Sequence, residues 1–252
     1  MATTVNVPEE VIEILKRCTM TATSVKLPTG QLPRALYDSV NKVFTAAGGR
    51  WDRKSGTHVF TRDPRELIGM ASETGKAVNI QQTLQSFYTP LSLSARMAGL
   101  ANIKRLDRVL EPSAGEGALA DAARALGGVV DCIEIDKHAV AVLAGKGFGV
   151  REVDFLKVPP YPDYDVVLMN PPFQRGQACS HTFHALGFLK PGGRLVGLMD
   201  AGVASRTDKA TTNFLNHVAR FGAKFERIPA GTFSESGTEV ATMMISLMLP
   251  KA

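Results

Sequence analysis

Residues 164–173 read YDVVLM-NPPF, and this stretch decides the fold that the sequence predicts. A short, continuous apolar run of this kind is typical of a strand that is buried on both faces of a parallel sheet. Neither proline can donate to a neighbouring strand, so the strand ends there in a stiff turn. Because open α/β sheets bind ligands at the carboxyl ends of their strands, we expect a binding site at Asn170. Its side-chain carbonyl, the backbone carbonyls of the turn and the Phe173 ring suit a planar group that carries an amine.

The sequence on both sides of this stretch alternates between apolar runs and amphipathic segments, which is the pattern of a doubly wound sheet. Strands are predicted over residues 108–110, 129–135, 149–152, 164–169, 194–199, 223–228 and 239–249. Helices are predicted from residue 91 to about 100, and over 118–126, 137–144, 179–189 and 208–221. Residues 229–238 leave no room for a helix, so the last two strands should pair antiparallel.

The N-terminal residues predict a separate, small α+β unit over residues 1–84, with a second domain over residues 85–252. Helices are expected over 8–17, 33–47 and 64–74, because prolines stand at their starts and glycines follow the last two. Residues 19–30 show no clear period and predict a loop. Residues 50–60 predict a hairpin with its turn at 53–56.

This predicted hairpin gathers cationic side chains beside Trp51, the single tryptophan of the chain; they are Arg50, Arg53, Lys54 and His58. One hypothesis is an element that contacts the phosphates of a nucleic acid. The alternative is a solvated turn with Trp51 packed in the core of the small unit, and the sequence favours this alternative.

Composition narrows the classes of function. The formal charge of +5 and the pI of about 9.2 are compatible with a polyanionic partner such as nucleic acid. No apolar run is long enough to span a membrane and no signal-peptide core is present, so we expect a cytoplasmic protein. The three cysteines are Cys18, Cys132 and Cys179. Their odd number and wide spacing predict reduced thiols, with neither a disulfide nor a metal site.

A glycine-rich turn follows the first predicted strand of the sheet, and residues 111–117 read EPSAGEG. Gly115 and Gly117 allow the backbone to approach a ligand closely, and the start of the next helix exposes N–H groups. The pattern is neither the dinucleotide-binding fingerprint nor a P-loop. The acid Glu111 would repel phosphate but suits an ammonium or sulfonium charge. A purely structural turn is the alternative.

Acidic residues also end the next two predicted strands. Glu134 stands where nucleotide-binding α/β proteins bind ribose hydroxyls, and Asp136 can also cap the following helix. Asp154 and Phe155 follow the third strand. A carboxylate there could accept from an adenine amine while the phenyl ring stacks on the purine.

Taken together, these motifs resemble class I S-adenosylmethionine-dependent methyltransferases, and most of all the DNA adenine-N6 methyltransferases with an Asn-Pro-Pro-aromatic signature. The resemblance covers roughly residues 85–249. It implies S-adenosylmethionine as the cofactor and DNA as the partner. It also implies a Rossmann-like, seven-stranded, mostly parallel sheet with strand order 3-2-1-4-5-7-6, in which strand 7 is antiparallel.

The resemblance further implies which residues form the site. The residues expected at the cofactor are Tyr88, Thr89, Pro90, Glu111, Pro112, Ser113, Gly115, Gly117, Glu134, Ile135, Asp154, Phe155 and Asn170. The catalytic residues would be Asn170, Pro171, Pro172 and Phe173. Substrate contacts would come from Phe173, Phe233 and Arg175.

The expected reaction is methyl transfer to an exocyclic amine, whose lone pair is delocalised into its ring. Hydrogen bonds to the Asn170 side-chain oxygen and the Pro171 carbonyl would favour a tetrahedral, nucleophilic nitrogen without a metal. A base in a duplex would first have to flip out. Other acceptors stay open, namely cytosine N4, guanine N2 of RNA and a protein glutamine, as does a non-catalytic nucleic-acid-binding relative.

Recognition of a DNA site is expected from the N-terminal unit, residues 174–177 and 201–209, and the segment around Phe233, because no large recognition domain follows Leu249. This compact form resembles the solitary methyltransferases of phages and mobile elements. The sequence predicts no particular protein partner.

Overall fold

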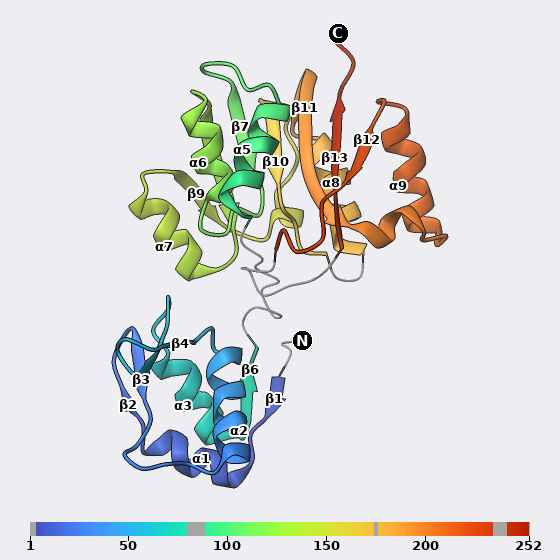
Figure 1. Ribbon diagram of the computed structural model, residues 1–252. Coiled ribbons are helices and arrows are strands. Elements are labelled where there is room, and N and C mark those ends of the chain that lie inside the picture. The colour runs from blue at the N-terminus through green and yellow to red at the C-terminus, as the bar shows by residue number, and fades with distance from the viewer. Residues whose placement is uncertain (1–3, 80–88, 174–175, 234–240, 252) are drawn as a thin grey trace. The chain divides into compact units, whose positions relative to one another are not determined.

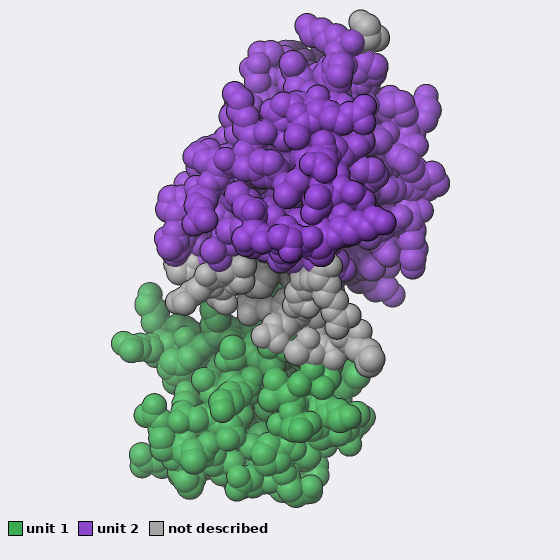
Figure 2. Space-filling model, turned by 90° about the vertical axis from the view of Figure 1, so that its right-hand side faces the viewer, with its two compact units in different colours: residues 1–86 green, residues 87–252 purple. Residues whose placement is uncertain are grey.

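The computed structural model describes residues 4–79, 89–173, 176–233 and 241–251. The chain divides into two compact units, Met1–Ser86 and Phe87–Ala252, which Figure 2 colours separately. Their hydrophobic cores share no residue, because the first draws on residues between Val7 and Ala77 and the second on residues between Leu93 and Leu247. None of the described helices is long and apolar enough to cross a membrane.

The second unit is built on a seven-stranded sheet with the order β12-β13-β11-β10-β7-β8-β9 (Figure 1). The strands are β7 (Arg108–Glu111), β8 (Val129–Glu134), β9 (Gly149–Glu152), β10 (Tyr164–Met169), β11 (Leu189–Asp200), β12 (Lys224–Arg227) and β13 (Thr242–Met248). β13 is antiparallel to both of its neighbours, and the other pairs are parallel. Read from β9, the order is 3-2-1-4-5-7-6, so the predicted fold class is confirmed.

Helices cover both faces of this sheet, as period-two alternation along the strands requires. In β10, Val166 and Leu168 enter the core beneath α5 (Leu91–Leu100), α6 (Ala118–Ala125) and α7 (Lys137–Gly145). Val167 and Met169 enter the core beneath α8 (Gln177–Leu186) and α9 (Lys209–Ala219). Two short 3-10 helices complete the described part of the unit, η1 (Phe155–Lys157) and η3 (Ala201–Ala204).

The structure corrects the boundary between α8 and β11. The sequence predicted a helix to residue 189 and a strand from 194, but α8 ends at Leu186 and β11 begins at Leu189. Tyr164 pairs with Leu189 and Val166 already pairs with Arg194, so β11 bulges between the two pairs. Pro191, Gly192 and Gly193 lie in this bulge, where a proline and a glycine with positive φ are tolerated inside a strand.

The first unit contains the three predicted helices, α1 (Glu9–Lys16), α2 (Arg34–Ala46) and α3 (Arg65–Thr74), and the predicted hairpin. Its larger sheet has the order β2-β3-β5-β4, where the strands are β2 (Thr19–Met20), β3 (Ser24–Lys26), β4 (Arg50–Asp52) and β5 (Thr57–Val59). A second sheet pairs β1 (Thr4–Asn6) antiparallel with β6 (Lys76–Val78), and the sequence did not predict either strand.

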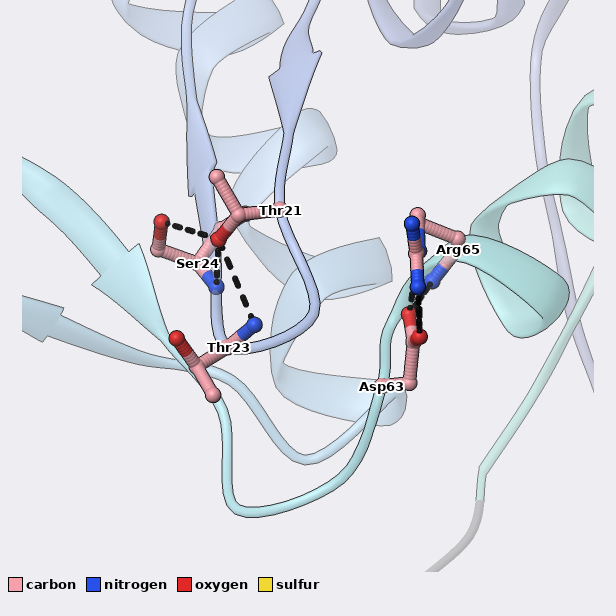
Figure 3. A network of polar contacts seen from close by, with 5 residues as sticks. All are labelled: Thr21, Thr23, Ser24, Asp63 and Arg65. Atoms are coloured by element: carbon pink, nitrogen blue, oxygen red, sulfur yellow. Dashed lines mark hydrogen bonds and ion pairs between the residues drawn. The ribbon is translucent and has the colours of Figure 1, made fainter.

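Residues 19–30 were predicted to form a loop, and this prediction was wrong for β2 and β3. A tight turn joins the two strands, in which Thr21 Oγ1 accepts the N–H groups of Ser24 at 2.9 Å and Thr23 at 3.3 Å (Figure 3). Strands of two and three residues are too short for their alternation to be visible in sequence, although Val25 in the middle of β3 is fully buried.

Trp51 is also placed differently from the favoured expectation. Its side chain is 46% exposed, whereas the core of the first unit is formed by other residues, of which Phe44, Leu15 and Ile68 are fully buried. Trp51 stands on the edge strand β4 opposite His58, and only His58 is buried there. The hairpin is therefore not a solvated turn with a core tryptophan.

Because the two cores share no residue, we expect Leu168→Ala to lower the unfolding free energy of the second unit by about 2–5 kcal/mol. Urea unfolding followed by circular dichroism would measure this change, while the fluorescence of Trp51 follows the first unit alone. Leu91→Ala, at a position that is 80% exposed, is the control and should leave both transitions unchanged. A shift of the Trp51 transition in Leu168→Ala would contradict two separate cores.

Candidate active site

The glycine-rich turn joins β7 to α6 at the carboxyl end of the sheet. Gly115 and Gly117 have φ values of 52° and 85°, in the left-handed region that favours glycine. A Cβ atom on Gly117 would lie 2.7 Å from Leu143 Cδ2, whereas one on Gly115 would meet no atom within 4 Å. The turn therefore packs closely against α7 on one side and is open at Gly115.

Glu134, the last residue of β8, holds this turn in place. Its Oε2 accepts the N–H of Gly115 at 2.7 Å, and its Oε1 accepts the N–H groups of Ile135 at 2.7 Å and Asp136 at 2.8 Å. Hydrogen bonds to an ionised acceptor are among the stronger ones in proteins. The adjacent ends of β7 and β8 are thus joined through one carboxylate, and Asp136 in turn caps α7 by accepting the His138 N–H.

Glu111, the last residue of β7, is buried and only partly satisfied. Its side chain is 2% exposed, and the N–H of Ala120 in the first turn of α6 donates to it. This contact replaces a side-chain cap, which Gly117 cannot provide. Its Oε2 is buried without a hydrogen-bond partner. Burial raises the pKa of Glu111 well above its usual value, and the nearby Glu134 and Asp121 raise that pKa further.

The Asn170 amide lies at the end of β10, beside the end of β7, because these two strands pair directly. Its Nδ2 donates to Thr89 Oγ1 at 3.1 Å, which joins two predicted site residues that are far apart in the sequence. Thr89 and Pro171 are buried, and Phe173 is half-buried and packs against both cores of the unit. The structure thus brings Thr89, Asn170 and the glycine-rich turn to one edge of the sheet.

Two other predicted aromatic contacts are buried. Phe155 is 3% exposed, and its ring packs against Phe188, His181 and His184 at centroid distances of 5.3, 5.7 and 4.8 Å. Phe233 is 4% exposed within the core on the α5 side. Neither ring offers an open face in this structure, so their ligand-binding roles stay predictions. Asp154 accepts the N–H of Leu156 at 3.1 Å and so begins η1.

The remaining predicted residues are distributed as follows. Pro112 and Ser113 lie in the glycine-rich turn, Pro90 precedes α5, and Ile135 is 60% exposed beside the Glu134 carboxylate. Tyr88 and Arg175 lie outside the described residues. Among the described residues, no group of three or more His, Cys, Asp or Glu side chains is arranged to hold a metal ion.

Sequence reasoning missed an ion pair at the end of β11, the strand next to β10. Asp200 is 8% exposed, and Arg206 Nη2 donates to its Oδ1 at 2.5 Å. The signal was available, because an acid at the end of a buried strand is the pattern that singled out Glu111 and Glu134. This pair fixes residues 200–206, part of the segment in which recognition residues were expected.

A cavity of about 850 Å³ lies between α8 and α9. Its lining includes Gly176, Phe183, Arg206, Phe214 and His217. None of the predicted cofactor or catalytic residues lines this cavity, so it is distinct from the cluster at Glu111, Glu134 and Asn170.

Comparison with known proteins supports the fold. No protein-family model and no curated protein sequence matches the chain. Among solved structures, it is similar to the methyltransferase subunit of a type I restriction-modification system from Streptococcus thermophilus, with 21% identity, a TM-score of 0.55, and coverage of 71% of this chain and 48% of that one.

Two further solved structures are similar. A protein assigned as a modification subunit of a type I restriction enzyme from Vibrio vulnificus shares 15% identity, with a TM-score of 0.56 and coverage of 86% of this chain and 54% of that one. A protein assigned to the class I S-adenosylmethionine-dependent methyltransferases from Listeria monocytogenes shares 13% identity, with a TM-score of 0.55 and coverage of 75% and 67%.

At these identities the similarity concerns the fold, and the chain spans about half of the length of the two restriction-modification subunits. The second unit therefore has the Rossmann-like fold that is also found in class I methyltransferases.

The conformation of the turn predicts a large effect of Gly117→Ala. A left-handed conformation costs a residue with a Cβ atom about 1–2 kcal/mol, and the contact with Leu143 adds to this cost. We expect the unfolding free energy to fall by at least about 2 kcal/mol, as measured by urea unfolding. Gly145→Ala, within α7 and with no atom within 4 Å of the added Cβ, should be neutral or stabilising. Equal losses in both variants would contradict this account of the turn.

The raised pKa of Glu111 predicts a pH-dependent stability. Its neutral form is favoured in the folded state, so this contribution is complete below the unfolded pKa of about 4.3 and is lost as pH rises through the folded pKa. Glu111→Gln removes this loss. We therefore expect its Tm to exceed that of the wild type increasingly above pH 5, by about 2–4 °C for each kcal/mol recovered.

Thermal unfolding of both proteins between pH 4 and pH 8 would measure this difference. Glu152→Gln, at an exposed position on β9, is the control. A difference in Tm that does not change with pH, or that becomes negative at high pH, would show that Glu111 is ionised in the folded protein.

Proposed function

We propose that the second unit transfers a methyl group from S-adenosylmethionine to the N6 amine of adenine in DNA. One observation carries the proposal. The Asn170 amide, bonded to Thr89 through its Nδ2, lies at the end of β10, next to the open glycine-rich turn and the acids at the ends of β7 and β8. In the proposal, the groups that would bind the planar amine therefore lie next to those that would bind the cationic methyl donor.

The residues around the turn fit this cofactor, which supplies a methyl group on a positively charged sulfonium when bound. Glu111 has a buried oxygen without a partner, and a positive charge beside this acid would favour its ionised form, which offsets the effect of burial on its pKa. The space at Gly115 leaves room for close approach of a ligand to the backbone. In the proposal, Glu134 and Ile135 bind the nucleoside part, and Asp154, Phe155, Tyr88, Pro90, Pro112 and Ser113 complete the site.

Residues 170–173 would activate the acceptor. The side-chain oxygen of Asn170 and the carbonyl of Pro171 each accept a hydrogen bond from the amine, which directs its lone pair away from the ring. The hydrogen bond from Asn170 Nδ2 to Thr89 Oγ1 supports this assignment, because it fixes the orientation of the amide group and therefore the position of its oxygen. Phe173 stacks on the base, for which a flipped adenine is required. The proton leaves to solvent after transfer, so no metal is needed for this step.

DNA is the acceptor that the remaining observations favour. The chain carries a formal charge of +5, and two of its structural neighbours are subunits of type I restriction-modification systems. One experiment distinguishes DNA from the alternative acceptors. Incubation with labelled cofactor and DNA, RNA or protein, followed by nucleoside and amino-acid analysis, would give N6-methyladenine if the proposal holds. Label in cytosine, guanine or glutamine would assign a different acceptor, and the absence of any transfer would contradict the proposed activity.

Asn170→Ala provides the sharpest test of the catalytic role. We expect it to lower kcat by about 10²–10³-fold, as the loss of one positioned polar group often does, and to weaken cofactor binding far less, because Asn170 is one of many residues expected at the cofactor. Single-turnover transfer and calorimetric titration of the cofactor would measure the two quantities. Asn216→Ala, at an exposed position in α9, is the matched control and should keep full activity. Retained activity in Asn170→Ala would exclude this role.

A further inference from the structure

The hairpin of β4 and β5 presents three cations that are not neutralised by neighbours. Arg50, Arg53 and Lys54 are exposed, and none of them forms an ion pair with a residue that the structure describes. Three other cations of the first unit are paired with carboxylates, namely Lys16 with Glu13, Arg34 with Asp38 and Arg65 with Asp63 (Figure 3 shows the last pair). The hairpin is therefore a local source of positive charge within this unit.

The turn that carries Arg53 and Lys54 is held in one conformation. Asp52 accepts the backbone N–H groups of Lys54 at 3.2 Å and Ser55 at 3.0 Å, and hydrogen bonds from Ser55 lower the pKa of this carboxyl group. Ser55 Oγ and Thr57 Oγ1 are 2.8 Å apart, and Gly56 has a φ of 62°. The single acid of the hairpin is thus used by the turn itself, and a rigid turn loses little entropy when it binds.

Trp51 stands between Arg50 and the turn in the sequence, and its ring rests on a buried support. Its ring contacts the His58 ring edge-on, with centroids 5.0 Å apart, and His58 Nε2 lies 2.9 Å from Asn41 Oδ1. Burial lowers the pKa of His58, so its ring is neutral and acts as a packing surface. Nearly half of Trp51 is open to solvent although the unit has its own apolar core. An exposed tryptophan next to unpaired cations is the combination that binds nucleic acid strands.

We propose that residues 50–57 bind DNA outside the catalytic site, with Arg50, Arg53 and Lys54 on its phosphates and Trp51 stacked on a base. The choice of DNA rests on the proposed function, whereas the phosphate and base contacts rest on the hairpin. Stacking requires an unpaired base, which is present in a single strand and at a locally opened site of a duplex. Binding through these residues would hold the strand while the second unit acts on it.

Trp51 is the only tryptophan of the chain, so its fluorescence reports on this hairpin alone. Titration of the full chain with a single-stranded and with a duplex oligonucleotide, each carrying a fluorescent label for anisotropy, would measure binding and Trp51 contact together. We expect the single strand to quench the Trp51 emission, and the duplex to quench it less. Trp51→Ala should weaken single-strand binding about tenfold, and Trp51→Phe should weaken it less.

The charges are tested by salt dependence. Replacing Arg50, Arg53 and Lys54 with glutamine should reduce the slope of log K against log salt by about 1 for each cation removed. The control replaces Lys16, Arg34 and Arg65, which removes the same charge from paired positions in the same unit. Its slope should change far less. Circular dichroism would establish that both triple variants are folded.

Two results would overturn the proposal. One is DNA binding, detected by anisotropy, that leaves the Trp51 emission unchanged. The other is an equal reduction of the salt slope in the two triple variants. Failure of the proposed function is distinguishable. If DNA quenches Trp51 and the salt slope falls in the hairpin variant, but no methyl group is transferred to DNA, then DNA binding by the hairpin stands and the proposed enzyme activity is contradicted. If methyl transfer occurs and its KM is unchanged in the hairpin variant, then the enzyme activity stands and DNA binding by the hairpin is contradicted.

Discussion

Burial of β10 on both faces is the constraint on which the rest of the second unit depends. Each residue from Val166 to Met169 is fully buried, with alternate side chains in the cores beneath the two helical layers. A strand enclosed in this way has no exposed face for polar chemistry, so polar groups are confined to its end. Asn170 stands at that end, followed by two prolines that prevent the ladder from continuing. The position of the amide is therefore a consequence of how the strand is packed.

The next two strands of the sheet, β7 and β8, end in the acidic residues Glu111 and Glu134, which have different roles. Glu134 accepts three backbone N–H groups and thereby joins the ends of β7 and β8 to the glycine-rich turn. Glu111 is buried with one oxygen unpartnered, an arrangement that typically costs about 1–3 kcal/mol. At a binding site, a ligand can supply the partner that the fold does not provide for such a group. One acid thus builds the turn, and the other supports the proposal of a cationic ligand beside it.

The first unit differs in how it uses charge. Its core is complete without the hairpin tryptophan, and its other exposed cations include several in local ion pairs. In the hairpin, the single acid, Asp52, instead accepts hydrogen bonds from the turn, and the cations form no ion pair with the described residues. Under the proposed function, the second unit would bind the flipped base and the hairpin of the first unit would bind the strand, so the two proposed roles fall on separate folds.

Much of the second unit could be predicted from the sequence, because its signals are local. Apolar runs marked the strands, Asp136 and Asp208 marked helix starts, and the short link after β12 required an antiparallel last strand. The resemblance to methyltransferases supplied the strand order. The errors fell where local signals are weak: β2 and β3 are too short to show a period, and the start of β11 is hidden by a proline and two glycines that only a bulge accommodates.

The sequence alone specifies which chemical groups stand at the end of each strand, because strand ends, turns and helix caps depend on residues that are adjacent in the sequence. It does not specify which of those groups remain accessible. Phe155 and Phe233, which stay predicted ligand contacts, are enclosed by side chains from distant segments, while Trp51 was expected in the core and is exposed. Accessibility depends on what packs across from a residue, and only the tertiary structure brings those partners together.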